Sequence, residues 1–360
     1  MKQVERLLGH RINNIIYIFF LLLIPVFWLR GYGHFFARVP QMFLWLSAVF
    51  IFFALLQRNI WIKLLLLWFL FLTIYYDFIV GFKVEGILYK TLNQESLLVL
   101  FTAIGIIVSI NFVQKLNEKY IKIFIYFSSL IVFYVWFFGY FKGWENLWIG
   151  GAYLAFCIPV ALSLHKKFYI NIFLCLPLLY GVYLSNSSMA VLTALGGIIS
   201  YLLLTKRYKL NGLFLLILLI VAGYWIPKHK DFLNMSFRDR MWELSLQKVG
   251  YKNWVGTGLK SFKRYGFIEG RDGKGVTYVS HPHNEFLEVY CEWGWVGLCL
   301  LLFYLGELVY MSNAPKEYVA GLMAVGVHCM GYYAARLACT GTLIIFYIGM
   351  LEKYRRGKEC

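Results

Sequence analysis

The stretch with the densest titratable side chains is SHPHNEFLEVYCEWGWVG, from Ser280 to Gly297. It places two histidines and three glutamates directly against a long hydrophobic run. His283 lies at this polar–apolar boundary near basic groups, and both conditions favour the neutral imidazole. A neutral imidazole can accept a proton from an alcohol beside a phosphate leaving group. His283 is therefore a candidate general base, and a structural histidine that caps the next helix is the alternative.

The same stretch raises the question of a metal site. His281 and His283 are two residues apart, so both side chains share one edge of an extended segment. A zinc site needs further ligands at suitable spacing, and Glu285 and Glu288 are the candidates. No stronger metal motif occurs in the chain, so we assign no metal and no cofactor. His281 is then expected to be a neighbour of the site.

The composition of the chain indicates whether water or lipid surrounds the elements that position these residues. The chain has 360 residues, of which 61% are hydrophobic, 20% aromatic and only 15% charged. A soluble domain of this length could not bury so much apolar surface. Solid apolar runs that approach the bilayer thickness indicate helices and not a β-barrel. The sequence predicts an all-α polytopic membrane protein embedded in a phospholipid bilayer.

About twelve transmembrane helices are predicted. Their spans are 15–29, 41–56, 60–80, 97–113, 121–141, 147–164, 168–184, 188–204, 210–226, 286–310, 317–334 and 337–351. The chain is thus divided into nine helices over 1–226, one large polar loop over 227–285, and helices ten to twelve with a tail over 286–360.

Lys and Arg in the short loops predict the orientation. Eighteen of them fall on one side of the predicted helices and six on the other. The richer side is expected to be cytoplasmic and to hold both termini. The large loop then lies outside the cytoplasm.

The large loop is itself basic, with eleven Lys and Arg. This excess suggests an anionic partner such as a pyrophosphate or an acidic lipid headgroup, and a solvated loop that lies against anionic lipids is the alternative. No nucleic-acid-binding motif accompanies the charge, so a nucleic acid partner is not expected.

Two local patterns stand out inside the loop. Ser236 and Asp239 form a capping box for a short helix, on which Arg238 and Trp242 share one face. Gly256 and Gly258 in NWVGTGLKSF permit a tight turn. A G-x-G pattern alone is weak, because neither a dinucleotide fingerprint nor a Walker motif surrounds it.

His283 and Asn284 are followed by nine residues and then by Gly294 and Gly297, a pattern written H-N-x9-G-x-x-G. This pattern resembles the signature of the bacterial O-antigen ligase family, which attaches glycans linked to polyprenyl pyrophosphate onto lipid A-core. The R-x-x-x-W of Arg238 and Trp242, the glycine turn and the single large loop are similar too. The specific resemblance covers about 236–297, and LSNSSMAVLTALGG matches more loosely.

The resemblance implies a mechanism. A glycan leaves undecaprenyl pyrophosphate by direct displacement at its anomeric carbon, with His283 as base and with Arg238, helped by Arg240, neutralising the pyrophosphate. No metal or cofactor is implied. The residues expected to support the site are Asn284, Glu292, Trp242, His281, Gly256 and Gly258. The implied location is the inner membrane of a Gram-negative bacterium, with the site facing the periplasm.

One departure concerns the outer end of the predicted 188–204 helix. The family commonly has Ser-Arg-Gly there, whereas this chain has Ser187, Ser188 and Met189. The family arginine expected to contact pyrophosphate is therefore absent at Ser188. Other cations are candidates to replace it, namely Arg240, Arg264 and Arg336.

Two kinds of alternative remain. An O-antigen polymerase or an O-linked protein oligosaccharyltransferase of the same superfamily would use the same donor and histidine with another acceptor. A polytopic transporter should instead show several ionisable residues deep in its helices or two matching halves. The interior acids are few, chiefly Asp77 and Glu307, and no matching halves occur.

Overall fold

The protein is described by a computed structural model. It describes residues 60–75, 118–137, 147–205, 238–258, 262, 267–268, 278–279, 281–311, 313–332 and 338–356. The helices are α3 (Ile60–Ile74), α5 (Glu118–Phe137), α6 (Leu147–Ala161), α7 (Phe168–Leu184), α8 (Ser188–Thr205), α10 (Arg238–Val249), α11 (Glu285–Met311), α12 (Lys316–Cys329) and α13 (Ala338–Arg356). The strands β1 (Phe267–Ile268) and β2 (Tyr278–Val279) form one short antiparallel pair.

The described residues are thus almost entirely helical, as predicted. The predicted span 168–184 coincides with α7, and 188–204 ends one residue before α8 does. The predicted spans 15–29, 41–56, 97–113 and 210–226 lie outside the described residues, so the count of twelve stays a prediction. By length and composition, α8 and α11 are the two described helices able to cross a membrane.

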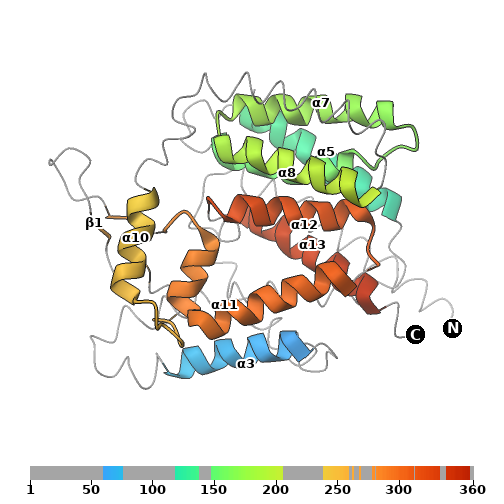
Figure 1. Ribbon diagram of the computed structural model, residues 1–360. Helices are drawn as coiled ribbons and strands as arrows, with labels where there is room; N and C mark the ends of the chain where they lie inside the picture. The colour runs from blue at the N-terminus through green and yellow to red at the C-terminus, as the bar shows by residue number, and fades with distance from the viewer. Residues whose placement is uncertain are drawn as a thin grey trace, which may run out of the picture.

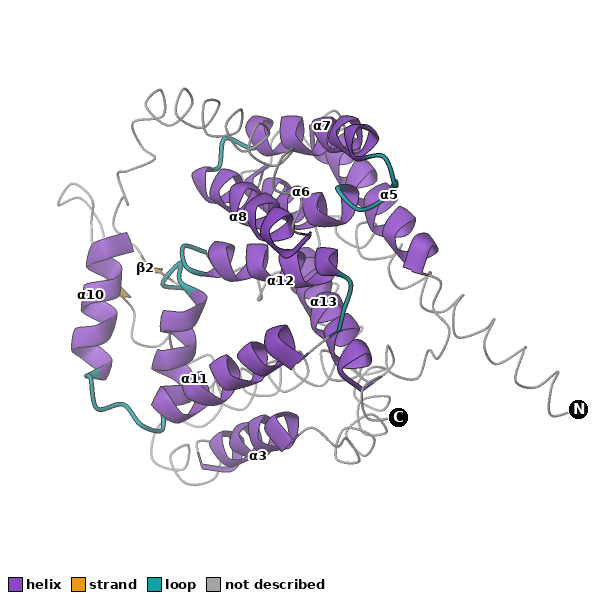
Figure 2. Ribbon diagram, turned by 45° about the vertical axis from the view of Figure 1, so that its right-hand side comes forward, coloured by secondary structure: helices purple, strands orange, loops and turns teal. Residues whose placement is uncertain are grey.

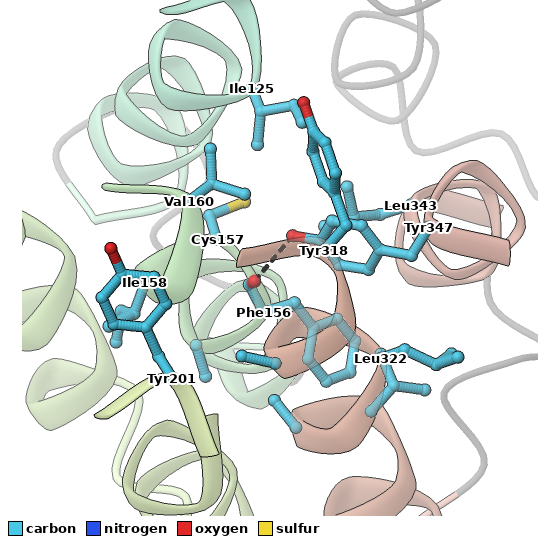
Figure 3. Close-up of a cluster of buried hydrophobic side chains, with 14 of the residues drawn as sticks. Ile125, Phe156, Cys157, Ile158, Val160, Tyr201, Tyr318, Leu322, Leu343 and Tyr347 are labelled. Carbon is cyan, nitrogen blue, oxygen red and sulfur yellow. Dashed lines mark hydrogen bonds between the residues drawn. The ribbon is translucent and has the colours of Figure 1, made fainter. Parts of the chain in front are cut away.

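Helix α6 forms the centre of the main hydrophobic core. Its residues Leu154, Ala155, Phe156 and Ile158 are fully buried. Helices α5, α7, α8 and α12 pack around α6, which lies behind α8 in Figure 1 and is labelled in Figure 2. The Tyr347 hydroxyl of α13 donates a 2.7 Å hydrogen bond to the Phe156 carbonyl oxygen across this core (Figure 3). Burial of these apolar groups stabilises the bundle by about 25 cal/mol per Å² wherever the alternative is water.

Helices α8 and α12 approach each other closely. A Cβ atom on Gly197 would lie 3.0 Å from the Ala324 Cβ, and one on Gly196 would lie 2.9 Å from the Val327 Cγ2. Small residues at such positions allow two backbones to pack tightly, as is common between helices in membranes. The amino-terminal end of α8, which begins at Ser188, is thereby held beside the carboxyl end of α12.

Glu307, an interior acid in the sequence, has a partner within the protein. The Arg355 Nη1 atom of α13 lies 2.8 Å from the Glu307 Oε2 atom of α11, and Lys122 of α5 pairs with Glu317 of α12. Buried charges are tolerated when they are paired in this way. These pairs connect four helices and give Glu307 a partner, whereas Asp77 lies outside the described residues.

Helix α11 differs from the single continuous helix predicted over 286–310. Gly294 has φ 71° and ψ −175°, so α11 consists of two helical halves that meet at a break. The half before Gly294 runs beside α10, and the half after it turns away along α3 (Figures 1 and 2). The bounds of the predicted span agree with α11 to within one residue at each end, but the break was not predicted because the apolar run continues through it.

The glycine turn of the large loop occupies the break in α11. Thr257 and Gly258 donate backbone hydrogen bonds of 3.0 Å to the carbonyl oxygens of Cys291 and Glu292. In return, Trp295 donates a 2.9 Å bond to the Asn253 carbonyl oxygen. Backbone groups that a broken helix leaves without partners are satisfied in this way. The G-x-G turn and the G-x-x-G motif are therefore two sides of one backbone junction.

Gly294→Ala is expected to destabilise the protein. This positive-φ conformation is essentially restricted to glycine and costs a residue with a Cβ roughly 1–3 kcal/mol. The added Cβ would also collide with the Trp254 carbonyl oxygen. Thermal unfolding in detergent should show a clear loss of stability. Gly306→Ala is the matched control in the same helix, because nothing lies within 4 Å of its added Cβ. Equal behaviour of both variants would contradict this account of the junction.

Candidate active site

His283 lies immediately before α11, in an unusual backbone conformation. Its φ is 51°, which few residues other than glycine adopt. Asn284 follows as the N-cap, since its Oδ1 atom accepts a 3.0 Å hydrogen bond from the Leu287 amide. The two residues of the H-N pair therefore have different roles. Asn284 caps the start of α11, and His283 lies immediately before it.

Helix α10 is anchored to the backbone next to His283. The Trp242 indole Nε1 donates a 2.7 Å hydrogen bond to the carbonyl oxygen of Pro282. Arg238 lies one turn earlier on the same face of α10, and its charge acts on His283. The R-x-x-x-W spacing thus brings an arginine to the histidine. Figure 1 shows α10 beside the first half of α11.

The environment keeps the His283 imidazole neutral. Burial is the largest cause, followed by the positive charge of Arg238 and by His281, and together they lower its pKa from 6.5 to about 4. A histidine with this pKa is neutral near pH 7 and can accept a proton. Burial also lowers the pKa of Arg238, while the nearby Tyr332 hydroxyl opposes that shift. Arginine keeps its charge throughout the physiological range.

His281 is paired with an acid. Its Nδ1 atom lies 2.8 Å from the Oε1 atom of Glu288, a residue only 1% exposed. This contact orients His281, which lies two residues before His283 in the sequence. The role of His281 as a neighbour of the site stays a prediction. Among the described residues, no three His, Cys, Asp or Glu side chains are grouped to hold a metal ion.

The predicted supporting residues of the loop bind other parts of the protein. The Gly256 amide donates to the Asn253 Oδ1 at 2.9 Å, and the Gly258 amide donates to Glu292. The buried Glu292 carboxylate lies 3.5 Å from the Phe262 amide nitrogen. These residues shape the junction beneath the first half of α11, and their amides are engaged within the protein.

The predicted alternative cations are only partly described. Arg240 lies in α10, two residues after Arg238. Its side chain lies outside the described residues, as do Arg264 and Arg336. Ser188 is the first residue of α8, whose N-cap is Ser187. The replacement of the family arginine by one of these cations remains a prediction.

The structure adds two side chains that the sequence did not single out. The Tyr332 ring centroid lies 5.2 Å from that of His283 and 5.5 Å from that of His328. The Thr193 hydroxyl lies 2.8 Å from the His328 Nδ1 atom. A histidine and a tyrosine four residues apart at the end of an apolar helix were a usable signal, because ionisable groups at membrane depth are seldom incidental.

Trp242→Phe is expected to lower activity without loss of folding. The variant keeps the ring but loses the hydrogen bond to Pro282, which contributes about 1 kcal/mol, or roughly fivefold in rate if α10 then moves from His283. Initial rates of transfer by purified protein measure the effect. Trp254→Phe is the matched control, because that side chain is 64% exposed. An unchanged rate in Trp242→Phe would contradict the anchoring role.

Comparison with known proteins agrees with the resemblance. The sequence model of the family described as O-antigen ligase matches residues 172–302. This segment contains most of α7, all of α8 and α10, and most of α11, together with Arg238 and His283. No curated protein matches the chain. The family consists of membrane-integral bacterial enzymes of glycosyltransferase type. Residues 172–302 of this chain are therefore similar to the O-antigen ligase family.

Proposed function

We propose that this protein transfers a glycan from undecaprenyl pyrophosphate to a hydroxyl group of lipid A-core on the periplasmic face of the inner membrane. The observation that carries the proposal is the pairing of a neutral His283 with Arg238, which α10 holds beside it through Trp242. A base and a fixed cation are the two groups that displacement of a pyrophosphate requires.

The reaction is a single displacement at the anomeric carbon. The acceptor oxygen forms a bond to this carbon while the bond to the pyrophosphate oxygen breaks. The acceptor proton goes to His283, and the electron pair goes to the pyrophosphate, whose growing charge Arg238 stabilises. Pyrophosphate is already a good leaving group, so the step needs neither a metal ion nor a covalent enzyme intermediate.

Donor binding strengthens the base. In the free protein, Arg238 disfavours the protonated form of His283. A bound pyrophosphate neutralises that arginine and places negative charge nearby, and both effects favour the imidazolium. The pKa of His283 therefore rises in the donor complex, toward the range in which a general base is most effective.

The pH dependence of transfer should show this change. Low pH protonates His283 and removes the base, so activity falls on the acid side. In kcat/KM, which reports the free protein, the midpoint should lie near pH 4. In kcat, which reports the donor complex, it should lie at a higher pH. Steady-state rates from about pH 3 to 8 measure both curves. A common midpoint near the ordinary histidine pKa would contradict the proposed environment of His283.

The acceptor is tested in cells. Deletion of the gene should leave complete polymer on the lipid carrier and lipid A-core without it. Single repeat units on lipid A-core would instead indicate a polymerase. Unchanged lipopolysaccharide with unglycosylated proteins would indicate a protein oligosaccharyltransferase. Complementation with the wild-type gene is the control, and unchanged glycans throughout would contradict the proposal.

A further inference from the structure

Tyr332 connects His283 to the transmembrane core. Its ring makes an edge contact with His283, with ring planes 66° apart, and a tilted contact with His328. Tyr332 is only 7% exposed, so its ring has little freedom to move. It lies beyond the matched segment 172–302, just after α12.

His328 is held in one orientation from the side of α8. The Thr193 hydroxyl donates a 2.6 Å bond to the Met189 carbonyl oxygen. Because that proton is used, the Thr193 oxygen accepts from His328, whose Nδ1 therefore carries the hydrogen. Phe156 packs edge-on against the other side of the His328 ring at 5.4 Å. His328 is thus a fixed support for Tyr332.

Packing between α8 and the end of α12 allows little adjustment. A Cβ atom on Gly331, the neighbour of Tyr332, would lie 2.6 Å from the Met189 Sδ atom. His328 is 1% exposed, and its Nε2 atom has no hydrogen-bond partner within the described part of the chain. A buried polar atom without a hydrogen-bond partner lowers the stability of a folded protein. The position of the His328 ring is therefore not explained by a contribution to stability.

We propose that Tyr332 is a positioning residue for the glycan transfer, whose ring fixes the orientation of the His283 imidazole and is itself held by the Thr193–His328 hydrogen bond. The inference rests on the proposed function, because His283 must be the base for its orientation to matter. The groups that face His283 are then Tyr332, Arg238 of α10 and His281 of its own loop.

The test compares variants that keep or remove the ring. Tyr332→Phe keeps it and should retain kcat within about twofold, whereas Tyr332→Leu should lower kcat at least tenfold with little change in the donor KM. Removal of the ring also exposes His283 to water, so the acid midpoint of kcat/KM should move up from about 4. A smaller amount of folded protein would lower the measured rate at every pH but would leave this midpoint unchanged.

Thr193 provides a second, milder test. Thr193→Val removes the acceptor for His328 and should lower kcat several-fold, while Thr193→Ser should restore it. Tyr201→Phe is the matched control, because Tyr201 is a buried tyrosine of α8 that donates to the Leu162 carbonyl oxygen instead.

Several outcomes overturn the inference. A loss in Tyr332→Phe equal to that in Tyr332→Leu would assign the role to the hydroxyl and not to the ring. An unchanged midpoint in Tyr332→Leu, or full activity in Thr193→Val, would also contradict positioning of His283. The proposed function fails separately, through full activity of His283→Ala, so the two failures are distinguishable.

Discussion

Replacement of His283 with alanine is expected to reduce glycan transfer by about 10²–10⁴-fold, the usual contribution of a general base. Folding and membrane insertion should be unaffected, because the N-cap bond of α11 belongs to Asn284 and not to His283. Alanine has a Cβ as histidine does, so the substitution leaves the backbone strain at φ 51° little changed. Transfer in membranes from a strain that lacks the native gene, at equal protein amounts, measures the effect.

His165→Ala is the matched control for this experiment. His165 lies between α6 and α7, where its Nδ1 accepts a 3.0 Å hydrogen bond from the Lys167 amide. Its replacement should leave transfer unchanged. Full activity of His283→Ala would remove the general base from the mechanism and the main support for the proposed function.

Replacement of Arg238 gives the second large effect. Arg238→Ala should lower kcat by about 10²–10³-fold, since loss of one preorganised group at the developing charge has this magnitude. Arg238→Lys should recover part of the rate, because lysine keeps the charge but not the two-pronged geometry. The acid midpoint of Arg238→Ala should also rise, because the charge that lowers the His283 pKa is lost.

Lys248→Ala is the matched control in the same helix. Lys248 lies in the last turn of α10, on its exposed side. Its replacement should leave both kcat and the acid midpoint unchanged. Equal losses of kcat in Arg238→Ala and Arg238→Lys would indicate that the reaction requires the geometry of the guanidinium group and not its charge alone. Wild-type activity in both variants would exclude Arg238 from the donor site.

Hydrophobic runs predicted much of the fold. The run over 168–184 coincides with α7 because Lys166 and Lys167 precede it and Ser185 ends it, so polar residues mark both boundaries. The break in α11 could not be found in the same way. It depends on backbone bonds from Asn253 and Thr257, about forty residues earlier in the chain.

The candidate site, like the fold, was predicted from the sequence only in part. His283, Asn284, Arg238 and Trp242 lie in short motifs, and the structure brings all of them together. The spacing of His328 and Tyr332 was a signal for this pair, but no local pattern in the sequence indicated that Tyr332 contacts His283, because the packing of α12 on α8 brings them together. The sequence predicted the tight turn at Gly256 and Gly258, but it did not predict that the Gly258 amide binds the Glu292 carbonyl oxygen at the break in α11.

The most direct test is transfer by the purified protein in vesicles, with a polyprenyl-pyrophosphate glycan as donor, lipid A-core as acceptor and a chelator present. The anomeric configuration of the new bond, determined by NMR, is the quantity to measure. Single displacement with His283 as base predicts transfer with inversion relative to the donor, and none in His283→Ala. Retention of configuration would require two successive displacements, and it would contradict the mechanism.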